Sequence, residues 1–137
     1  MFQLHQRLEA DTVLIGEFAL CLALLSKDAN YPWVILVPRR SEIKEIHQLS
    51  SEDRQQLLHE SCVVAEAMEA TFTPDKLNIA SIGNMVPQLH LHHVVRFESD
   101  VAWPGPVWGA VAALAYEDQM LANRVAVMRQ SLSGFLR

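Results

Sequence analysis

Two histidines and a glutamine alternate with leucines in the segment Gln88-Leu89-His90-Leu91-His92. Read as a β-strand, this alternation places Gln88, His90 and His92 on one face, about 7 Å apart from one to the next. A neutral imidazole is a good nucleophile near pH 7, because its unperturbed pKa is about 6.5. It can attack phosphorus and form a covalent phosphoramidate, while its neighbours hold the non-bridging oxygens. The segment therefore predicts a phosphate site, to which the backbone amides of Gly83-Asn84-Met85 can add donors.

The same alternation is also typical of two other kinds of strand. A His-x-His pair is a common metal-ligand arrangement, and a row of polar side chains can be an ordinary solvent-facing surface. Only His90 and His92 are obvious ligands on this face, and no acidic residue adjoins them. His93 is expected to share the opposite face with Leu89 and Leu91, which predicts a structural histidine rather than a catalytic one.

Five segments of the chain have strand character. The first two, separated by Gly16-Glu17, predict a hairpin with Gly16 in its turn. The third is rich in β-branched and aromatic residues and stops at Pro38. The segments are 12–15, 19–25, 33–37, 76–82 and 89–95.

Two segments have helical spacing. Ser50 is a candidate N-cap, and apolar residues at helical intervals predict a long helix from Ser51 that ends before Pro74. A second helical pattern runs over residues 110–132. The order predicts an α+β fold: a five-stranded antiparallel sheet, one long helix between strands three and four, and a C-terminal helix.

The length, net charge, cysteine content and hydropathy of the chain limit the functions that it can have. The 137 residues fit a single domain, 1–137, and the formal net charge of −5 argues against binding to a nucleic-acid polymer. Cys21 and Cys62 form no CxxC pair, which indicates reduced, buried thiols. No apolar run approaches the length of about 20 residues that crosses a bilayer, and the N-terminus lacks an apolar signal segment. We therefore expect a cytoplasmic protein with no membrane partner.

The segment Gly83 to His92 resembles the signature of the histidine triad (HIT) superfamily, in which His-x-His-x-His is followed by apolar residues. The similarity to that superfamily extends to other parts of the chain: residues 75–78 before the signature, Trp103-Pro104 after it, and the order of elements from Thr12 to Trp108. The resemblance implies a HIT-like fold and a HIT-family nucleotidyl hydrolase or transferase. It further implies a small-molecule nucleotide substrate, a homodimer, and no required metal or other cofactor.

The resemblance also implies roles for individual residues. It identifies His90 as the nucleophile, His92 as a contact to the phosphate, and Gln88 as the first triad position. The implied substrate-binding residues are Asn78 near the nucleotide, Asn84 and Met85 in the loop that faces the phosphates, and Asp28 and Asn30 near the ribose. Phosphoramidates, dinucleoside polyphosphates and adenylates are the implied substrates.

Two residues depart from the family pattern. Gln88 replaces a histidine and cannot titrate, and Trp33 stands at or near a position where many members carry a further histidine. These departures support an alternative function, a catalytically weak nucleotide-binding or sensor dimer. A metal-binding protein that uses His90 and His92 is the second alternative.

Overall fold

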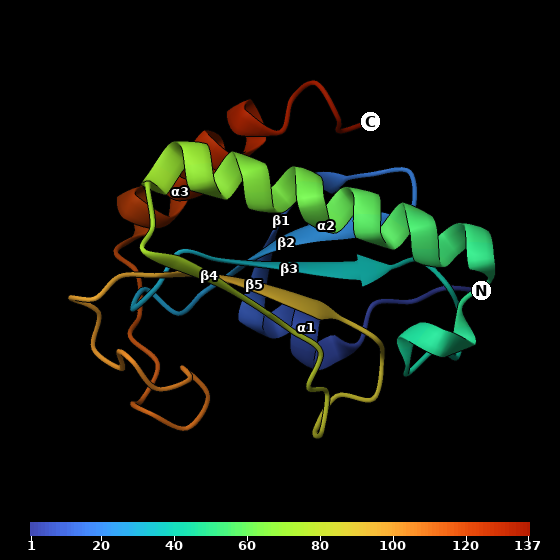
Figure 1. The fold of residues 1–137 in the computed structure, drawn as a ribbon, viewed down its shortest axis with the longest axis horizontal. Helices are drawn as coiled ribbons and strands as arrows, with labels where there is room; N and C mark the ends of the chain where they lie inside the picture. Colours follow the sequence, from blue (N-terminus) through green and yellow to red (C-terminus); the bar gives the residue numbers. More distant parts are fainter.

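A five-stranded antiparallel sheet organises the computed structural model, which describes residues 1–137 (Figure 1). The strand order is β1-β2-β3-β5-β4, so β5 lies between β3 and β4, and β1 and β4 form the edges. The strands are β1 (Thr12–Glu17), β2 (Cys21–Ser26), β3 (Trp33–Pro38), β4 (Lys76–Ala80) and β5 (Leu91–Arg96). The predicted α+β fold is confirmed.

Helices cover both faces of this sheet. The long helix α2 (Ser51–Phe72) and the C-terminal helix α3 (Asp118–Ser131) lie on one face, and the short helix α1 (Gln6–Asp11) lies on the other (Figure 1). A 3₁₀ turn at Ile46–Gln48 precedes α2. The predicted cap is present, because the Ser50 hydroxyl accepts a hydrogen bond from the Asp53 amide at 3.1 Å. None of the helices combines the length and the apolar character that crossing a bilayer requires.

The side chains of β5 alternate between the core side of the sheet and the opposite, polar side. Leu91 and Val95 belong to the main core, which α2 and α3 cover. His93 lies on the same side, where its Nε2 is 2.7 Å from the Ser61 hydroxyl of α2. The predicted orientation of His93 toward the helices is therefore confirmed. By strand alternation, His92 faces the side on which α1 packs.

Several predicted boundaries are wrong. Gly16 does not occupy the first turn; it lies within β1 at a register irregularity, and the chain reverses after Glu17. A Cβ at Gly16 would stand 2.9 Å from the Leu136 Cδ1, so the glycine gives room to the C-terminal tail. The last strand begins at Leu91 rather than at 89, and the fourth ends at Ala80 rather than at 82.

The helical predictions also need two corrections. The C-terminal helix begins at Asp118, and residues 110–117 form no helix although their apolar residues have helical spacing. These residues instead bridge back to the loop after β2, where the amide of Ala29 donates to the carbonyl of Leu114 at 2.7 Å. Helix α1 was not predicted, because its six residues carry too little periodicity to be distinguished from a polar loop.

A buried carboxylate joins α2 to the reversal between β1 and β2. Glu60 is 1% exposed. Its two carboxylate oxygens accept hydrogen bonds from the backbone amides of Leu20 at 2.9 Å and Cys21 at 2.8 Å, and from the Gln56 side chain at 2.6 Å. The carboxylate thus satisfies two buried backbone donors that no strand partner reaches.

We predict that Glu60→Ala lowers the free energy of unfolding by about 2–4 kcal/mol, because it leaves those two buried amides without acceptors. Urea denaturation measures the change. The matched control is Glu66→Ala, an exposed glutamate of the same helix, which is expected to change stability by less than about 0.5 kcal/mol. Equal losses in the two variants would contradict the role of the carboxylate.

Candidate active site

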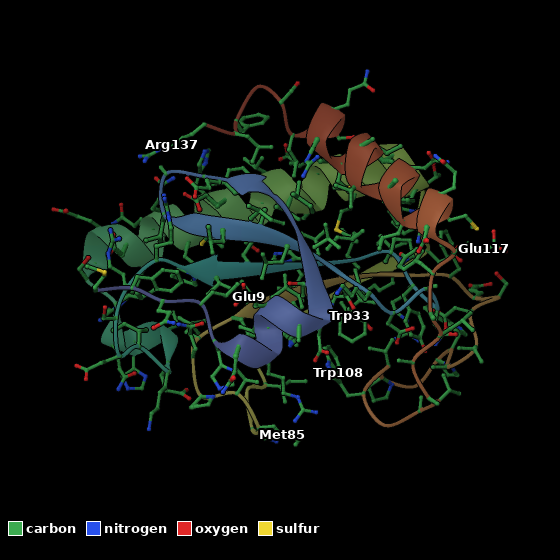
Figure 2. The ribbon with its side chains drawn as sticks, turned by 180° about the vertical axis from the view of Figure 1, so that it is seen from behind. Glu9, Trp33, Met85, Trp108, Glu117 and Arg137 are labelled. Atoms are coloured by element: carbon green, nitrogen blue, oxygen red, sulfur yellow. The ribbon has the colours of Figure 1, made fainter.

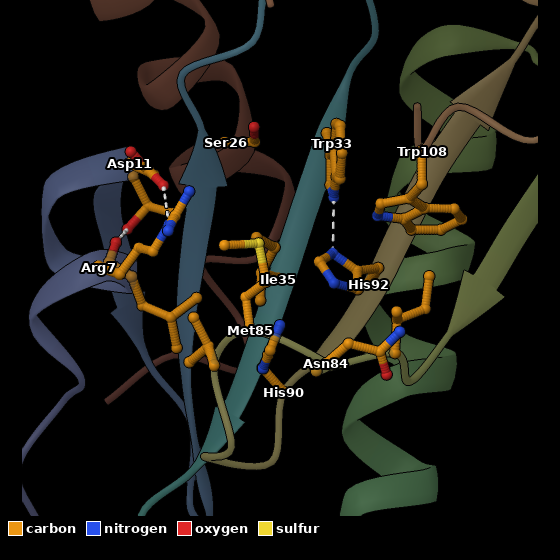
Figure 3. A pocket seen from close by; sticks show the side chains of 15 residues that line it. Arg7, Asp11, Ser26, Trp33, Ile35, Asn84, Met85, His90, His92 and Trp108 are labelled. Atoms are coloured by element: carbon orange, nitrogen blue, oxygen red, sulfur yellow. Dashed lines mark hydrogen bonds and ion pairs between the residues drawn. The ribbon is translucent and has the colours of Figure 1, made fainter. Parts of the chain in front are cut away.

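A hollow of about 400 Å³ opens on the α1 side of the sheet. Figure 3 shows Arg7 and Asp11 at one side of it and Trp33, His92 and Trp108 at the other, with His90 between them. The loop 82–86 completes the lining. Figure 2 shows the same region from behind, with Trp33 and Trp108 beside α1. Both predicted histidines therefore face one pocket.

His90 is held by the backbone two residues before it. Its Nδ1 lies 2.7 Å from the carbonyl oxygen of Gln88. Because a carbonyl only accepts hydrogen bonds, Nδ1 must carry the proton, and the lone pair of a neutral ring is then on Nε2. The residue is 5% exposed. This arrangement gives His90 the tautomer of a nucleophile that attacks through Nε2.

His92 has the opposite tautomer, because Trp33 binds its other nitrogen. The indole Nε1 donates to the His92 Nδ1 at 3.0 Å. An indole N–H can only donate, so Nδ1 accepts and the proton of the neutral ring is on Nε2. Burial, together with the neighbouring imidazoles of His90 and His93, lowers the pKa of His92 to about 3. His92 is therefore a neutral hydrogen-bond donor at physiological pH.

Aromatic rings enclose this histidine pair. The ring centroids of His90 and His92 are 4.8 Å apart, and those of His92 and Trp108 are 5.2 Å apart. Trp33 and Trp108 meet edge to face at 5.8 Å. The two indoles form an apolar wall on which a flat ligand ring can stack.

The Gln88 side chain does not join the histidines. Its Oε1 accepts from the His5 amide and its Nε2 donates to the Gln3 carbonyl, both at 2.9 Å. Gln88 also does not line the pocket. The predicted row of three side chains is therefore wrong at its first position, because the strand begins only at Leu91 and alternation does not extend back to residue 88.

The loop before the histidines is shaped by a glycine. Gly83 has a φ of +56°, and a Cβ there would lie 3.0 Å from the Val86 carbonyl oxygen and 3.7 Å from the His90 Cε1. The loop carries Asn84 and Met85 into the pocket lining. The backbone N–H groups of residues 83–86 donate to no protein backbone acceptor. These N–H groups are therefore candidate donors to a ligand anion.

Asn78 lies on the polar face of the sheet but outside the pocket lining. Its Oδ1 accepts from the Arg96 guanidinium at 2.7 Å. Arg96 is 1% exposed and forms an ion pair with Asp100 at 2.8 Å. The bond to Arg96 keeps the pKa of Asp100 near 2. Asn78 thus belongs to a buried network that braces the loop after β5.

Asp28 and Asn30 are likewise engaged with the chain itself. The Asp28 Oδ1 accepts from the amide and side chain of Asn30 and from the amide of Leu114. The Asn30 side chain also donates to the Ala112 carbonyl at 3.1 Å. Neither residue lines the pocket. Both tie the 110–115 segment to the loop after β2.

Two charged pocket residues were not anticipated, Arg7 and Asp11. They stand four residues apart on α1, and their side chains form an exposed ion pair at 3.9 Å. Their position in the pocket depends on where the N-terminal segment docks, which no local pattern indicates. Nowhere in the structure do three His, Cys, Asp or Glu side chains gather in a manner suited to a metal ion.

Comparisons with known proteins find a family model and several solved structures that are similar to this chain. A family model described as the HIT domain matches residues 7–99. The crystal structure of a histidine triad protein from Marinobacter aquaeolei has 51% sequence identity and a TM-score of 0.95, with 98% of each chain covered. A histidine triad protein from Bradyrhizobium japonicum has 44% identity and a TM-score of 0.93, covering 95% of this chain and 97% of that one. No curated protein matches the sequence significantly.

We predict that stability falls as the pH drops from 7.5 to 5. Burial holds the folded pKa of His92 near 3 and that of His93 near 4, both below the unfolded value of 6.5. The unfolded chain therefore binds more protons below pH 6.5, and each histidine removes about 2 kcal/mol of stability over this range. Urea denaturation at the two pH values measures the loss.

The variant His92→Gln isolates one of these contributions. Between pH 7.5 and 5, this variant is expected to lose about 2 kcal/mol less of its free energy of unfolding than the wild type loses. The control is His59→Gln, because His59 is exposed on α2 and its replacement is expected to leave the pH dependence unchanged. An identical pH dependence in wild type and His92→Gln would contradict the neutral, buried state of His92.

Proposed function

Because the chain belongs to the HIT domain family, we propose that it hydrolyses or transfers nucleotidyl groups through a covalent intermediate on His90. Proteins of this family generally bind nucleotides and act on their phosphoryl bonds. The observation that carries the proposal is the hydrogen bond between His90 Nδ1 and the Gln88 carbonyl. It leaves Nε2 of a neutral ring free as a nucleophile in a pocket that can hold a nucleotide.

The proposed reaction has two steps at phosphorus. In the first, His90 Nε2 attacks the α-phosphorus, a P–N bond forms, and the bond to the leaving group breaks with its electron pair. The ring then carries positive charge, which the Gln88 carbonyl stabilises at Nδ1. In the second step, water or another acceptor attacks phosphorus, and the electron pair of the P–N bond returns to Nε2. The nucleoside monophosphate leaves as the free acid or as a transferred group.

The neighbouring groups bind the phosphoryl oxygens. His92 donates through Nε2–H, because Trp33 occupies its Nδ1. Asn84, Met85 and the unpaired amides of their loop are proposed as further contacts to the phosphates. The Trp33 and Trp108 rings offer a surface for the nucleobase. We assign Asn78, Asp28 and Asn30 an indirect role, since they brace the loops around the pocket.

A nucleotide sensor without turnover is the second candidate function. It is supported by the Gln88 side chain, which is directed away from the histidines, so that no titratable group occupies the first triad position. Calorimetry with AMP, paired with a turnover assay, separates the two functions. Saturable binding with no turnover of any nucleotide favours the sensor.

We also propose that the protein is a homodimer joined at the β4 edge. The other edge, β1, is covered: Arg129 of α3 donates to the carbonyls of Leu14 and Ile15 at 2.9 and 3.0 Å. No strand covers β4, and its Ile79 is 48% exposed. An uncovered edge with an apolar side chain favours pairing with a second copy of the chain.

For catalysis, we predict that His90→Asn lowers kcat at least about 1,000-fold, because the variant lacks the nucleophile. Hydrolysis of adenosine 5′-phosphoramidate and of diadenosine tetraphosphate is measured by release of AMP. His47→Gln, which changes an exposed histidine outside the pocket lining, is the control and is expected to retain wild-type rates. Undiminished turnover by His90→Asn would rule out the covalent mechanism.

For assembly, we predict that Ile79→Lys converts a dimer into a monomer, because a charge at the β4 edge opposes pairing. Sedimentation at micromolar concentration measures the mass. Val127→Lys is the matched control, because Val127 is similarly exposed, at 41%, on α3. A wild-type protein that sediments as a monomer would contradict the proposed dimer.

A further inference from the structure

Arg7 is the only lysine or arginine among the residues that line the pocket. Its side chain is 56% exposed, and its only ion pair is the long contact of 3.9 Å with the exposed Asp11. Such a pair contributes little energy, so the guanidinium can exchange it for a ligand anion at small cost. Because the formal net charge of the chain is −5, this single cation matters for any polyanionic ligand.

The pocket is poor in groups that can give a proton to a leaving group. His92 is neutral, and its Nδ1 is occupied by the Trp33 indole. The Gln88 side chain lies outside the pocket and is bound to the N-terminal backbone at both ends of its amide. The only carboxyl group in the lining, Asp11, lies on the α1 side beside Arg7 (Figure 3).

From these two features together, we propose that Arg7 binds the leaving group, and that the pocket selects substrates whose leaving group departs as an anion. The substrate class is phosphoanhydrides of nucleoside 5′-phosphates, such as dinucleoside polyphosphates, in preference to phosphoramidates. This inference rests on the proposed function and narrows its substrates. Arginine suits the role because its planar guanidinium pairs with two phosphate oxygens at once.

The bond changes show why the two substrate classes differ. When His90 Nε2 displaces a phosphoanhydride, the P–O bond breaks and its electron pair remains on the bridging oxygen of the departing phosphate. That product is a stable anion, which needs no proton and is stabilised by the Arg7 guanidinium. When the leaving group is an amine, the P–N bond can break only if the nitrogen receives a proton, because an amide anion is too basic to depart.

The Gln88 side chain acts in this scheme as a positioning residue for Arg7. Its Oε1 accepts from the His5 amide at 2.9 Å, and the His5 Nδ1 in turn accepts from the Arg7 amide at 3.1 Å. The amide of Gln88 therefore fixes the residue that caps α1, and this cap fixes the backbone of Arg7. Residue 88 thus orients His90 through its carbonyl and α1 through its side chain.

The test compares Arg7→Gln, Arg7→Lys and wild type on two substrates, diadenosine tetraphosphate and adenosine 5′-phosphoramidate. For Arg7→Gln we expect kcat/KM to fall about 10- to 100-fold with the polyphosphate and less than about threefold with the phosphoramidate. Arg7→Lys restores part of the loss, since it keeps the charge. Arg40→Gln, which removes an exposed arginine paired with Asp53 outside the pocket, is the charge-matched control and leaves both rates unchanged.

Three outcomes overturn the inference: equal losses with both substrates, no loss with either, or a wild-type preference for the phosphoramidate. Gln88→Ala is the second variant, and it is expected to reproduce the loss selective for the polyphosphate in weaker form. A Gln88→Ala loss that is equal for both substrates contradicts the positioning role.

Failure of the proposed function gives a different result. In that case, wild type and His90→Asn turn over neither substrate, and calorimetry tests the Arg7 contact on its own. Arg7→Gln is then expected to weaken binding of a non-hydrolysable dinucleoside polyphosphate about tenfold or more, while AMP binding stays within about twofold. Equal affinity of wild type and Arg7→Gln for the polyphosphate overturns the inference without reference to catalysis.

Discussion

The hydrogen bond between His90 Nδ1 and the Gln88 carbonyl determines which ring nitrogen can react. The bond requires a backbone that turns before β5, because in a regular strand the residue 88 carbonyl would point along the sheet toward a neighbouring strand. The Leu89 amide stabilises this turn by donating to the Ile43 carbonyl at 2.8 Å. The chemistry that we propose at His90 therefore depends on the place where β5 begins, and a longer strand would lose the orientation of the ring.

Trp33 gives the neighbouring histidine the opposite orientation. Its indole N–H occupies Nδ1 of His92, so the two imidazoles present a lone pair and a donor to the same pocket. Many members of the family carry a histidine at or near the position of Trp33. The indole N–H of Trp33 can only donate a hydrogen bond. The consequence is electrostatic: His92 stays neutral, and Arg7 is the one side chain in the lining that supplies a permanent positive charge.

Much of the fold could be predicted from local patterns. Helix α2 has a capping serine and a long periodic run, and β3 has β-branched residues up to its final proline, so both were correct. Gly16 and residues 110–117 were misinterpreted because tertiary contacts, with the C-terminal tail and with the loop after β2, decide their conformation. The two histidines could be placed from alternation and resemblance. Arg7 could not, because the position of α1 depends on a hydrogen bond between His5 and Gln88, which are 83 residues apart.

The most direct test of the account is to determine the tautomers of the two histidines by ¹⁵N–¹H NMR of histidine-labelled protein at pH 7.5, without any substrate. The structure predicts that neutral His90 carries its proton on Nδ1 and His92 on Nε2. Replacing Trp33 with Phe is expected to release His92 from this single tautomer and to leave that of His90 unchanged. A proton on Nε2 of neutral His90 in the wild type would contradict the assignment of His90 as the nucleophile.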